Sequence, residues 1–90
     1  MKTFEINLTK KDIQQGEQGN NMCCPIALCV HRKTGKRFRV RPNSIVTQEG
    51  NLVVVLPKKA QQFIYRFDRS TTKKIKPISF NIDIPNSFLI

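Results

Sequence analysis

Hydrophobic and polar residues alternate along several short stretches of the chain, a pattern typical of β-strands with one buried face. The clearest stretches are residues 4–8, 37–41 and 78–84, in which every second side chain is apolar. Gln48–Gly50 separates two further strand-like segments and predicts a hairpin turn. The continuous apolar run Leu52–Leu56 predicts a central strand that is buried on both faces.

Two helices are predicted from capping residues and from helical periodicity. Thr9, three residues before Asp12, is a variant of the capping box and predicts a single helical turn over residues 10–15. A longer helix is expected to begin at Pro57 because apolar residues follow it at intervals of three and four. That apolar stripe consists of Ala60, Phe63, Ile64 and Phe67.

A third helix is predicted between Pro25 and Gly35. Proline suits the first helical position, where a backbone N–H has no partner, and Cys24 would then be the N-cap. Gly35 follows basic residues and ends the helix. Because residues 26–30 are apolar on nearly every helical face, we expect this helix to be covered on more than one side.

These elements follow in the order β-α-β-β-(β)-α-β, which predicts a single α+β domain over residues 1–90. The expected architecture is a two-layer sandwich: a mostly antiparallel sheet of four to five strands with two helices on one face. A ferredoxin-like split βαβ arrangement is one candidate topology.

The chain is strongly basic, with sixteen Lys and Arg against six Asp and Glu and a net charge of +10. This balance predicts an acidic partner, namely nucleic acid, nucleotide phosphates, an anionic membrane surface or an acidic protein. The alternative is a surface charged for solubility alone. No apolar run approaches the roughly 18–20 residues that span a bilayer, and no signal peptide is recognised. Three cysteines are a poor disulfide framework, so we expect a reducing, cytoplasmic setting without membrane attachment.

Much of the positive charge lies directly after the helix that begins at Pro25, in a segment without an acid. Residues 37–41 place three arginines on one face of a strand, roughly 6.5–7 Å apart, which approximates the spacing of successive phosphates. The alternative is that the charge only blocks pairing between strand edges. The predicted binding residues in this segment are Arg32, Lys33, Lys36, Arg37, Arg39 and Arg41. A second basic group is predicted from Lys58, Lys59, Lys73, Lys74 and Lys76.

The helix start supports a weaker hypothesis. Backbone N–H groups converge at a helix N-terminus, so Cys24, Ile26 and Ala27 are candidates for a phosphate cradle that would hold a nucleotide. A thiol at this position can also have a lowered pKa, which would make Cys24 reactive. A structural role for Cys24 is nevertheless the favoured interpretation.

Catalysis and metal binding are not indicated. The chain has one histidine, His31, and Cys29 lies on a different face of the same predicted helix. The acids show no spacing for acid–base chemistry, and the glycines form no phosphate-binding loop. Cys23, Cys24, Cys29 and His31 lack the spacing of a zinc site. We therefore expect a non-enzymatic protein that uses no metal or cofactor.

Aromatic residues give little support to base recognition. Stacking on bases needs exposed rings, and only Tyr65 and Phe88 fall outside the predicted core faces. The apolar segment Phe88, Leu89 and Ile90 is expected either to fold back onto the core or to pack against a second copy as a homodimer.

Several short motifs resemble those of a family of small uncharacterised bacteriophage and prophage proteins. They are Cys24-Pro25-Ile26-Ala27-Leu28, Leu56-Pro57, Ala60, Phe63-Ile64, Arg66-Phe67-Asp68, Pro77-Ile78-Ser79-Phe80, and Asp12-Ile13 before Gly16. The chain departs from the family pattern at Cys29, at His31 and in its dense basic segment. The resemblance implies an accessory protein in the cytoplasm of a bacterial host cell and, by analogy, one that counters host defence.

Sequence and resemblance together favour a non-enzymatic phage protein that binds a phosphate-rich ligand, either nucleic acid or nucleotide. The alternative is a protein-binding inhibitor of a bacterial anti-phage defence factor, such as a nuclease complex. In that case the basic surface would meet an acidic groove of the host protein.

Overall fold

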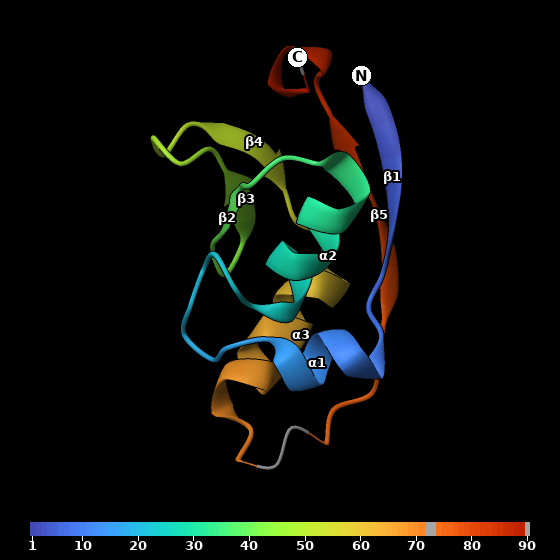
Figure 1. The fold of residues 1–90 in the computed structure, drawn as a ribbon, viewed down its shortest axis with the longest axis vertical. Helices are drawn as coiled ribbons and strands as arrows, with labels where there is room; N and C mark the ends of the chain where they lie inside the picture. Colours follow the sequence, from blue (N-terminus) through green and yellow to red (C-terminus); the bar gives the residue numbers. More distant parts are fainter. Residues whose placement is uncertain (72–73, 90) are drawn as a thin grey trace.

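The computed structural model of the protein describes residues 1–71 and 74–89. Within these residues the chain forms three α-helices and two antiparallel sheets, which confirms the α+β class (Figure 1). The elements are β1 (Lys2–Asn7), α1 (Lys10–Gln15), α2 (Pro25–Thr34), β2 (Arg39–Val40), β3 (Ser44–Val46), β4 (Leu52–Val55), α3 (Lys58–Arg69), β5 (Ser79–Ile84) and the short 3-10 helix η1 (Asn86–Phe88).

The strands form two antiparallel sheets rather than one. β1 pairs with β5 from Lys2, opposite Ile84, to Asn7, opposite Ser79. β2, β3 and β4 form the second sheet in that order. No two strands pair in parallel within the described residues, so the ferredoxin-like topology, which is built on parallel βαβ units, is wrong.

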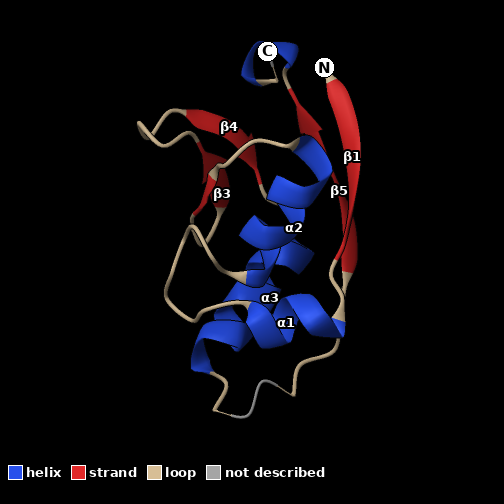
Figure 2. Cartoon of the chain, viewed as in Figure 1, coloured by secondary structure: helices blue, strands red, loops and turns tan. Residues whose placement is uncertain are grey.

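The α2 helix occupies the space between the two sheets, as Figures 1 and 2 show. It contacts α1, β1 and β2, which explains why its sequence is apolar on nearly every face. The predicted ends are confirmed. The Cys24 thiol accepts a hydrogen bond from the N–H of Ala27 (3.4 Å), and Gly35 adopts a left-handed conformation with φ of 74°.

The strand β4 lies at the edge of its sheet, so the prediction of a central, doubly buried strand is wrong. Leu52 and Val55 are 57% and 61% exposed, while Val53 is buried. The central strand is β3, in which all three residues are buried. A run of apolar residues therefore marks a strand here without showing that both of its faces are covered.

The segment after α1 passes unusually close to the start of α2. A Cβ atom added at Gly16 would lie 2.5 Å from Cδ of Pro25, closer than any side chain allows. Glycine at this position therefore allows the short helix α1 to pack against α2. The predicted capping box of α1 is also present, since Thr9 and Asp12 exchange both of its hydrogen bonds.

The amphipathic prediction for α3 is confirmed, and its buried residues are Ala60, Phe63, Ile64 and Phe67. At the other end of the chain, Phe88 and Leu89 are half-buried and pack against the core, so for these two residues the fold-back alternative holds. Ile90 lies outside the described residues, and the homodimer stays a prediction. None of the helices found in the described residues has the length and apolar character needed to cross a membrane.

Candidate functional site

The three arginines of the predicted strand lie on the solvent side of the three-stranded sheet. Arg37, Arg39 and Arg41 are exposed, whereas the intervening Phe38 and Val40 are only 7% and 5% exposed. The predicted alternation is therefore confirmed, although only Arg39–Val40 has regular strand pairing. We call these three residues the arginine face.

Backbone hydrogen bonds fix the strand that carries the arginine face. The N–H of Arg41 donates to the carbonyl of Ser44 (2.7 Å), on the side of β3. The N–H of Val40 points away from β3 and donates to the carbonyl of Asn21 (2.8 Å). Because both sides of this short strand are tied to other segments, the arginine side chains project from a rigid backbone.

Exposed aliphatic side chains lie on the edge strand β4 of the same sheet, beyond the buried β3. Arg39 pairs with Val46 on β3, and Val46 in turn pairs with Leu52 on the edge strand β4. Val55, which pairs with Ser44, is the second exposed apolar residue of β4. The outer surface of this sheet thus combines guanidinium groups with exposed aliphatic carbon.

Carboxylates lie near both ends of the arginine face. Arg37 lines a shallow hollow together with Glu49 of the hairpin, and Arg41 lines a cavity together with Asp68 of α3. Neither Glu49 nor Asp68 forms an ion pair with a described residue. The one ion pair found between described residues joins Arg32 and Asp12. The arginine face is therefore cationic with acids at its margins.

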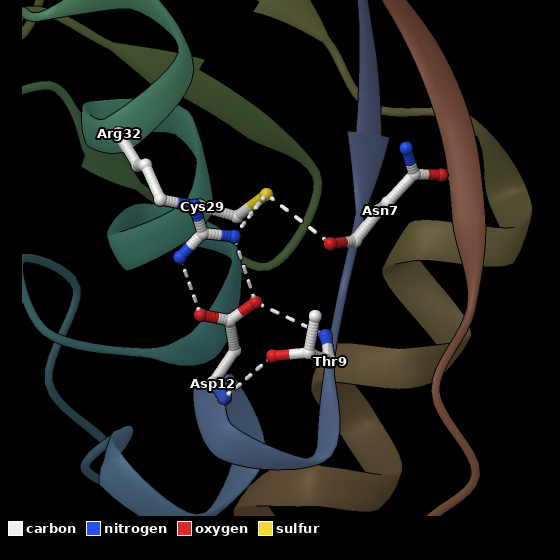
Figure 3. A network of polar contacts seen from close by, with 5 residues as sticks. All are labelled: Asn7, Thr9, Asp12, Cys29 and Arg32. Carbon is white, nitrogen blue, oxygen red and sulfur yellow. Dashed lines mark hydrogen bonds and ion pairs between the residues drawn. The ribbon is translucent and has the colours of Figure 1, made fainter.

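Arg32 belongs to the interior network of the fold rather than to the arginine face. Its Nη1 and Nη2 atoms donate to the two carboxylate oxygens of Asp12 at 2.8 and 3.1 Å, as Figure 3 shows. Nη2 also lies 3.4 Å from the Cys29 sulfur. The N–H of Thr9 donates to the same carboxylate (3.0 Å). Arg32 therefore joins α2 to α1. Because its guanidinium group already binds Asp12, ligand binding is at most a second role for this arginine.

The titration of Asp12 reflects this network. Burial raises the pKa of the carboxyl, but the hydrogen bonds from Arg32 and Thr9 and the positive charge of Arg32 outweigh it, so the pKa lies below its usual value. The same hydrogen bond to Asp12 raises the pKa of Arg32. At neutral pH both groups are charged, and Asp12 is only 3% exposed.

The remaining basic residues of the predicted segment occupy the end of α2 and the turn after it. Lys33 is exposed in the last helical turn. Lys36 is half-buried, its N–H donates to the Thr34 hydroxyl (3.1 Å), and it lines the same hollow as Arg37. Of the six basic residues predicted as a site, Arg32 is thus paired with Asp12, Lys36 is half-buried, and Lys33, Arg37, Arg39 and Arg41 are exposed.

The start of α2 does not offer a free phosphate cradle. The N–H of Ala27 already donates to the Cys24 sulfur, Pro25 has no N–H, and Ile26 and Ala27 are 0% and 4% exposed. Cys24 and Ile26 do line a cavity of about 220 Å³ together with Arg41, and Ala27 does not. The backbone N–H groups that would bind an anion at this helix start are thus largely engaged by the N-cap residue or covered by the fold.

The buried thiols of Cys24 and Cys29 do not have the lowered pKa that is typical of a reactive cysteine. Burial raises the pKa of Cys24, although the N–H groups of Ala27 and Ile26 act in the opposite direction. Burial likewise raises the pKa of Cys29, whose thiol points toward the carbonyl of Asn7 (3.6 Å). The raised pKa of Cys24 argues against a reactive thiol and agrees with the favoured interpretation of Cys24 as a structural residue. Within residues 1–71 and 74–89, no three His, Cys, Asp or Glu side chains come together as a metal site requires.

A second basic group lines a groove between α3 and the segment that leads into β5. Lys59 from α3 faces Lys74 and Lys76 across this groove, as the sequence predicted for these three residues. Lys58 does not line it, and Lys73 lies outside the described residues. Arg66 is a fourth cation of the groove that sequence reasoning missed. The signal was available, because positions 59 and 66 differ by seven and so share one face of a helix.

Comparison of the chain with protein-family models, with curated proteins and with solved structures finds no match. The bacteriophage family resemblance stays a prediction.

Proposed function

We propose that this protein binds the phosphate backbone of nucleic acid through the arginine face and catalyses no reaction. The observation that carries the proposal is the exposure of Arg37, Arg39 and Arg41 at alternate positions of one tethered strand. Guanidinium groups at this spacing suit successive phosphates because each can donate two parallel hydrogen bonds to phosphate oxygens. Lys33, at the end of α2, adds a fourth exposed cation.

The aromatic residues support recognition of the backbone rather than of bases. Tyr65 is the only aromatic residue among the strongly exposed large hydrophobic side chains, and Arg69 lies over its ring at 3.7 Å. Phe88, the other ring that the sequence left free, packs against the core. With Tyr65 as the one strongly exposed ring among the described residues, and Arg69 over that ring, the proposed binding is mainly electrostatic and largely independent of base sequence.

A charge-matched pair of variants tests this proposal. The first variant replaces Arg37, Arg39 and Arg41 with glutamine, and the second replaces three exposed lysines elsewhere with glutamine. The control positions are Lys2, Lys11 and Lys58. Both variants lower the net charge from +10 to +7, because each removes three positive charges.

Fluorescence anisotropy with labelled duplex DNA at low salt is the measurement. We expect the arginine variant to bind about 500-fold more weakly than the unmodified protein near 0.1 M salt, since each of the three lost phosphate contacts contributes about a factor of eight. The lysine variant should lose much less. Equal losses in both variants would mean that net charge alone drives binding, and no binding by the unmodified protein would refute the proposal.

A second candidate function is inhibition of a host protein, and the exposed Leu52 and Val55 favour it. Protein interfaces are enriched in arginine and use exposed apolar carbon, and both occur on this sheet. A pull-down from nuclease-treated bacterial lysate distinguishes the two candidates. A protein partner survives the nuclease and is lost when Leu52 and Val55 are replaced with aspartate, whereas a nucleic-acid bridge is destroyed by the nuclease.

The biological setting is a further part of the proposal. We place the protein among phage accessory proteins that act in the cytoplasm of a bacterial host, where binding of nucleic acid or of an acidic defence factor would counter host defence. The support for this setting is the sequence resemblance together with the basic surface. Expression of the arginine variant in a phage-challenged host tests it, because a role in countering host defence requires that protection of the phage be lost with the arginine face.

A further inference from the structure

The groove between α3 and residues 74–78 is a second cationic site, separate from the arginine face. It has a volume of about 530 Å³ and is lined by Lys59, Arg66, Lys74 and Lys76, and no carboxylate of a described residue lines it. In Figure 1 the end of α3 and the segment that leads into β5 lie toward the end of the long axis opposite the two chain termini, whereas the three-stranded sheet lies nearer to them. The two cationic surfaces can therefore act on different ligands.

Two pairs of cations form the walls of the groove. Lys59 and Arg66 lie seven residues apart on one face of α3, which corresponds to about 10 Å along the helix. Lys74 and Lys76 are both exposed and lie at most about 7 Å apart along the facing segment. Ile75, between these two lysines, is half-buried and packs against the core, which anchors the segment.

The position of one ammonium group is fixed by the fold. The Nζ atom of Lys59 donates to the carbonyl of Ser79 at 3.1 Å, at the start of β5. An ammonium has three N–H donors, so two remain for a ligand. Lys74 and Lys76 also line a neighbouring hollow with Lys10 of α1, which extends the positive surface beyond the groove.

The rest of the lining is mainly apolar, and we call it the apolar floor. It consists of Phe63, Ile75, Pro77 and Ile78, with Gln62 beside them. A mostly apolar concavity of this size with a few charged groups at its rim is typical of sites for small molecules. A ligand that fits must therefore combine several negative charges with a flat or apolar portion.

We infer that this groove binds a nucleoside polyphosphate, with the phosphates between the two pairs of cations and the base and ribose over the apolar floor. Four cations without an acid match the three to four negative charges of a triphosphate. A volume of about 530 Å³ is in the range of small-molecule sites, which favours a nucleotide over a longer anionic chain. The inference does not depend on nucleic-acid binding by the arginine face.

Isothermal titration of the full-length protein with ATP, tripolyphosphate and a short single-stranded oligonucleotide tests the inference at low salt. The groove variant carries Arg66→Gln and Lys74→Gln, and the control variant carries Arg37→Gln and Arg39→Gln. Both variants lose two positive charges, and all four side chains are exposed, so both are expected to fold. Circular dichroism verifies folding.

We expect ATP to bind the unmodified protein more tightly than tripolyphosphate, because only ATP covers the apolar floor. The groove variant should bind ATP about tenfold to a hundredfold more weakly, and the control variant should bind it nearly as well as the unmodified protein. A control variant that loses duplex DNA but keeps ATP would separate this site from the arginine face. The inference is overturned if ATP does not bind, if tripolyphosphate binds equally well, if only the oligonucleotide binds, or if both variants lose ATP equally.

Discussion

Replacing Arg32 with alanine is expected to lower the free energy of unfolding by about 2–3 kcal/mol at pH 7. The substitution leaves the Asp12 carboxylate, only 3% exposed, without its charged partner. Removing one member of a buried pair typically destabilises a protein by about 3–5 kcal/mol. We take a lower value because the Arg32 side chain is 52% exposed, so water can replace part of what it supplies.

Urea denaturation followed by circular dichroism measures this loss, and two further variants isolate its cause. Arg39→Ala removes an exposed arginine of the arginine face and should change stability by less than about 0.5 kcal/mol. The double variant R32A/D12N removes the buried charge as well as its partner, so it should regain about 1 kcal/mol relative to R32A. The expected fall in the melting temperature for R32A is about 10–20 °C.

The pH dependence follows from the lowered pKa of Asp12. A carboxyl with a lower pKa in the folded state stabilises the protein above its unfolded pKa, about 3.9, and that stability is lost as the pH falls through the folded pKa. Without Arg32, burial favours the protonated acid instead. The difference between the unmodified protein and R32A should therefore be largest near neutral pH and shrink below about pH 4. A difference that stays constant with pH, or an R32A variant as stable as R39A, would refute this reasoning.

Two more predictions concern the packing around α2. Gly16→Ala should destabilise the protein by about 2–3 kcal/mol in urea denaturation, because the new Cβ would lie 2.5 Å from Cδ of Pro25. In the control Gly35→Ala the new Cβ meets no atom, so that variant should lose only about 1–2 kcal/mol, the cost of alanine in a left-handed conformation. Equal losses in the two variants would contradict the packing argument. Alkylation followed by mass spectrometry should modify the half-exposed Cys23 first, and the buried Cys24 thiol, whose pKa is raised, only when the protein unfolds; prompt modification of Cys24 would show that its pKa is not raised.

Local features of the fold could be predicted from the sequence because their causes are local. The capping box at Thr9, the N-cap at Cys24 and the left-handed Gly35 each depend on residues within one turn of a helix. Alternation likewise predicted that the arginine side chains of residues 37–41 would face solvent. These features need no information about distant parts of the chain.

Features that depend on distant residues could not be predicted in this way. The pairing of β1 with β5 joins the two ends of the chain, and the ion pair of Arg32 with Asp12 spans twenty positions. Nothing in the basic segment distinguishes Arg32, which holds two helices together, from Arg39, which faces solvent. The apolar run that includes Leu52 was misleading for the same reason, since exposure depends on which neighbours cover a strand.

The dependence of DNA binding on salt tests the proposed function most directly. Four exposed cations at the arginine face and the end of α2 are Lys33, Arg37, Arg39 and Arg41. If each neutralises one phosphate of a duplex, the logarithm of the binding constant should fall with the logarithm of salt concentration at a slope of about −3.6. The variant without the three arginines should show a slope of about −0.9, and the variant without the three control lysines a slope close to the original. A slope near zero, or the same reduced slope in both variants, would contradict binding by the arginine face.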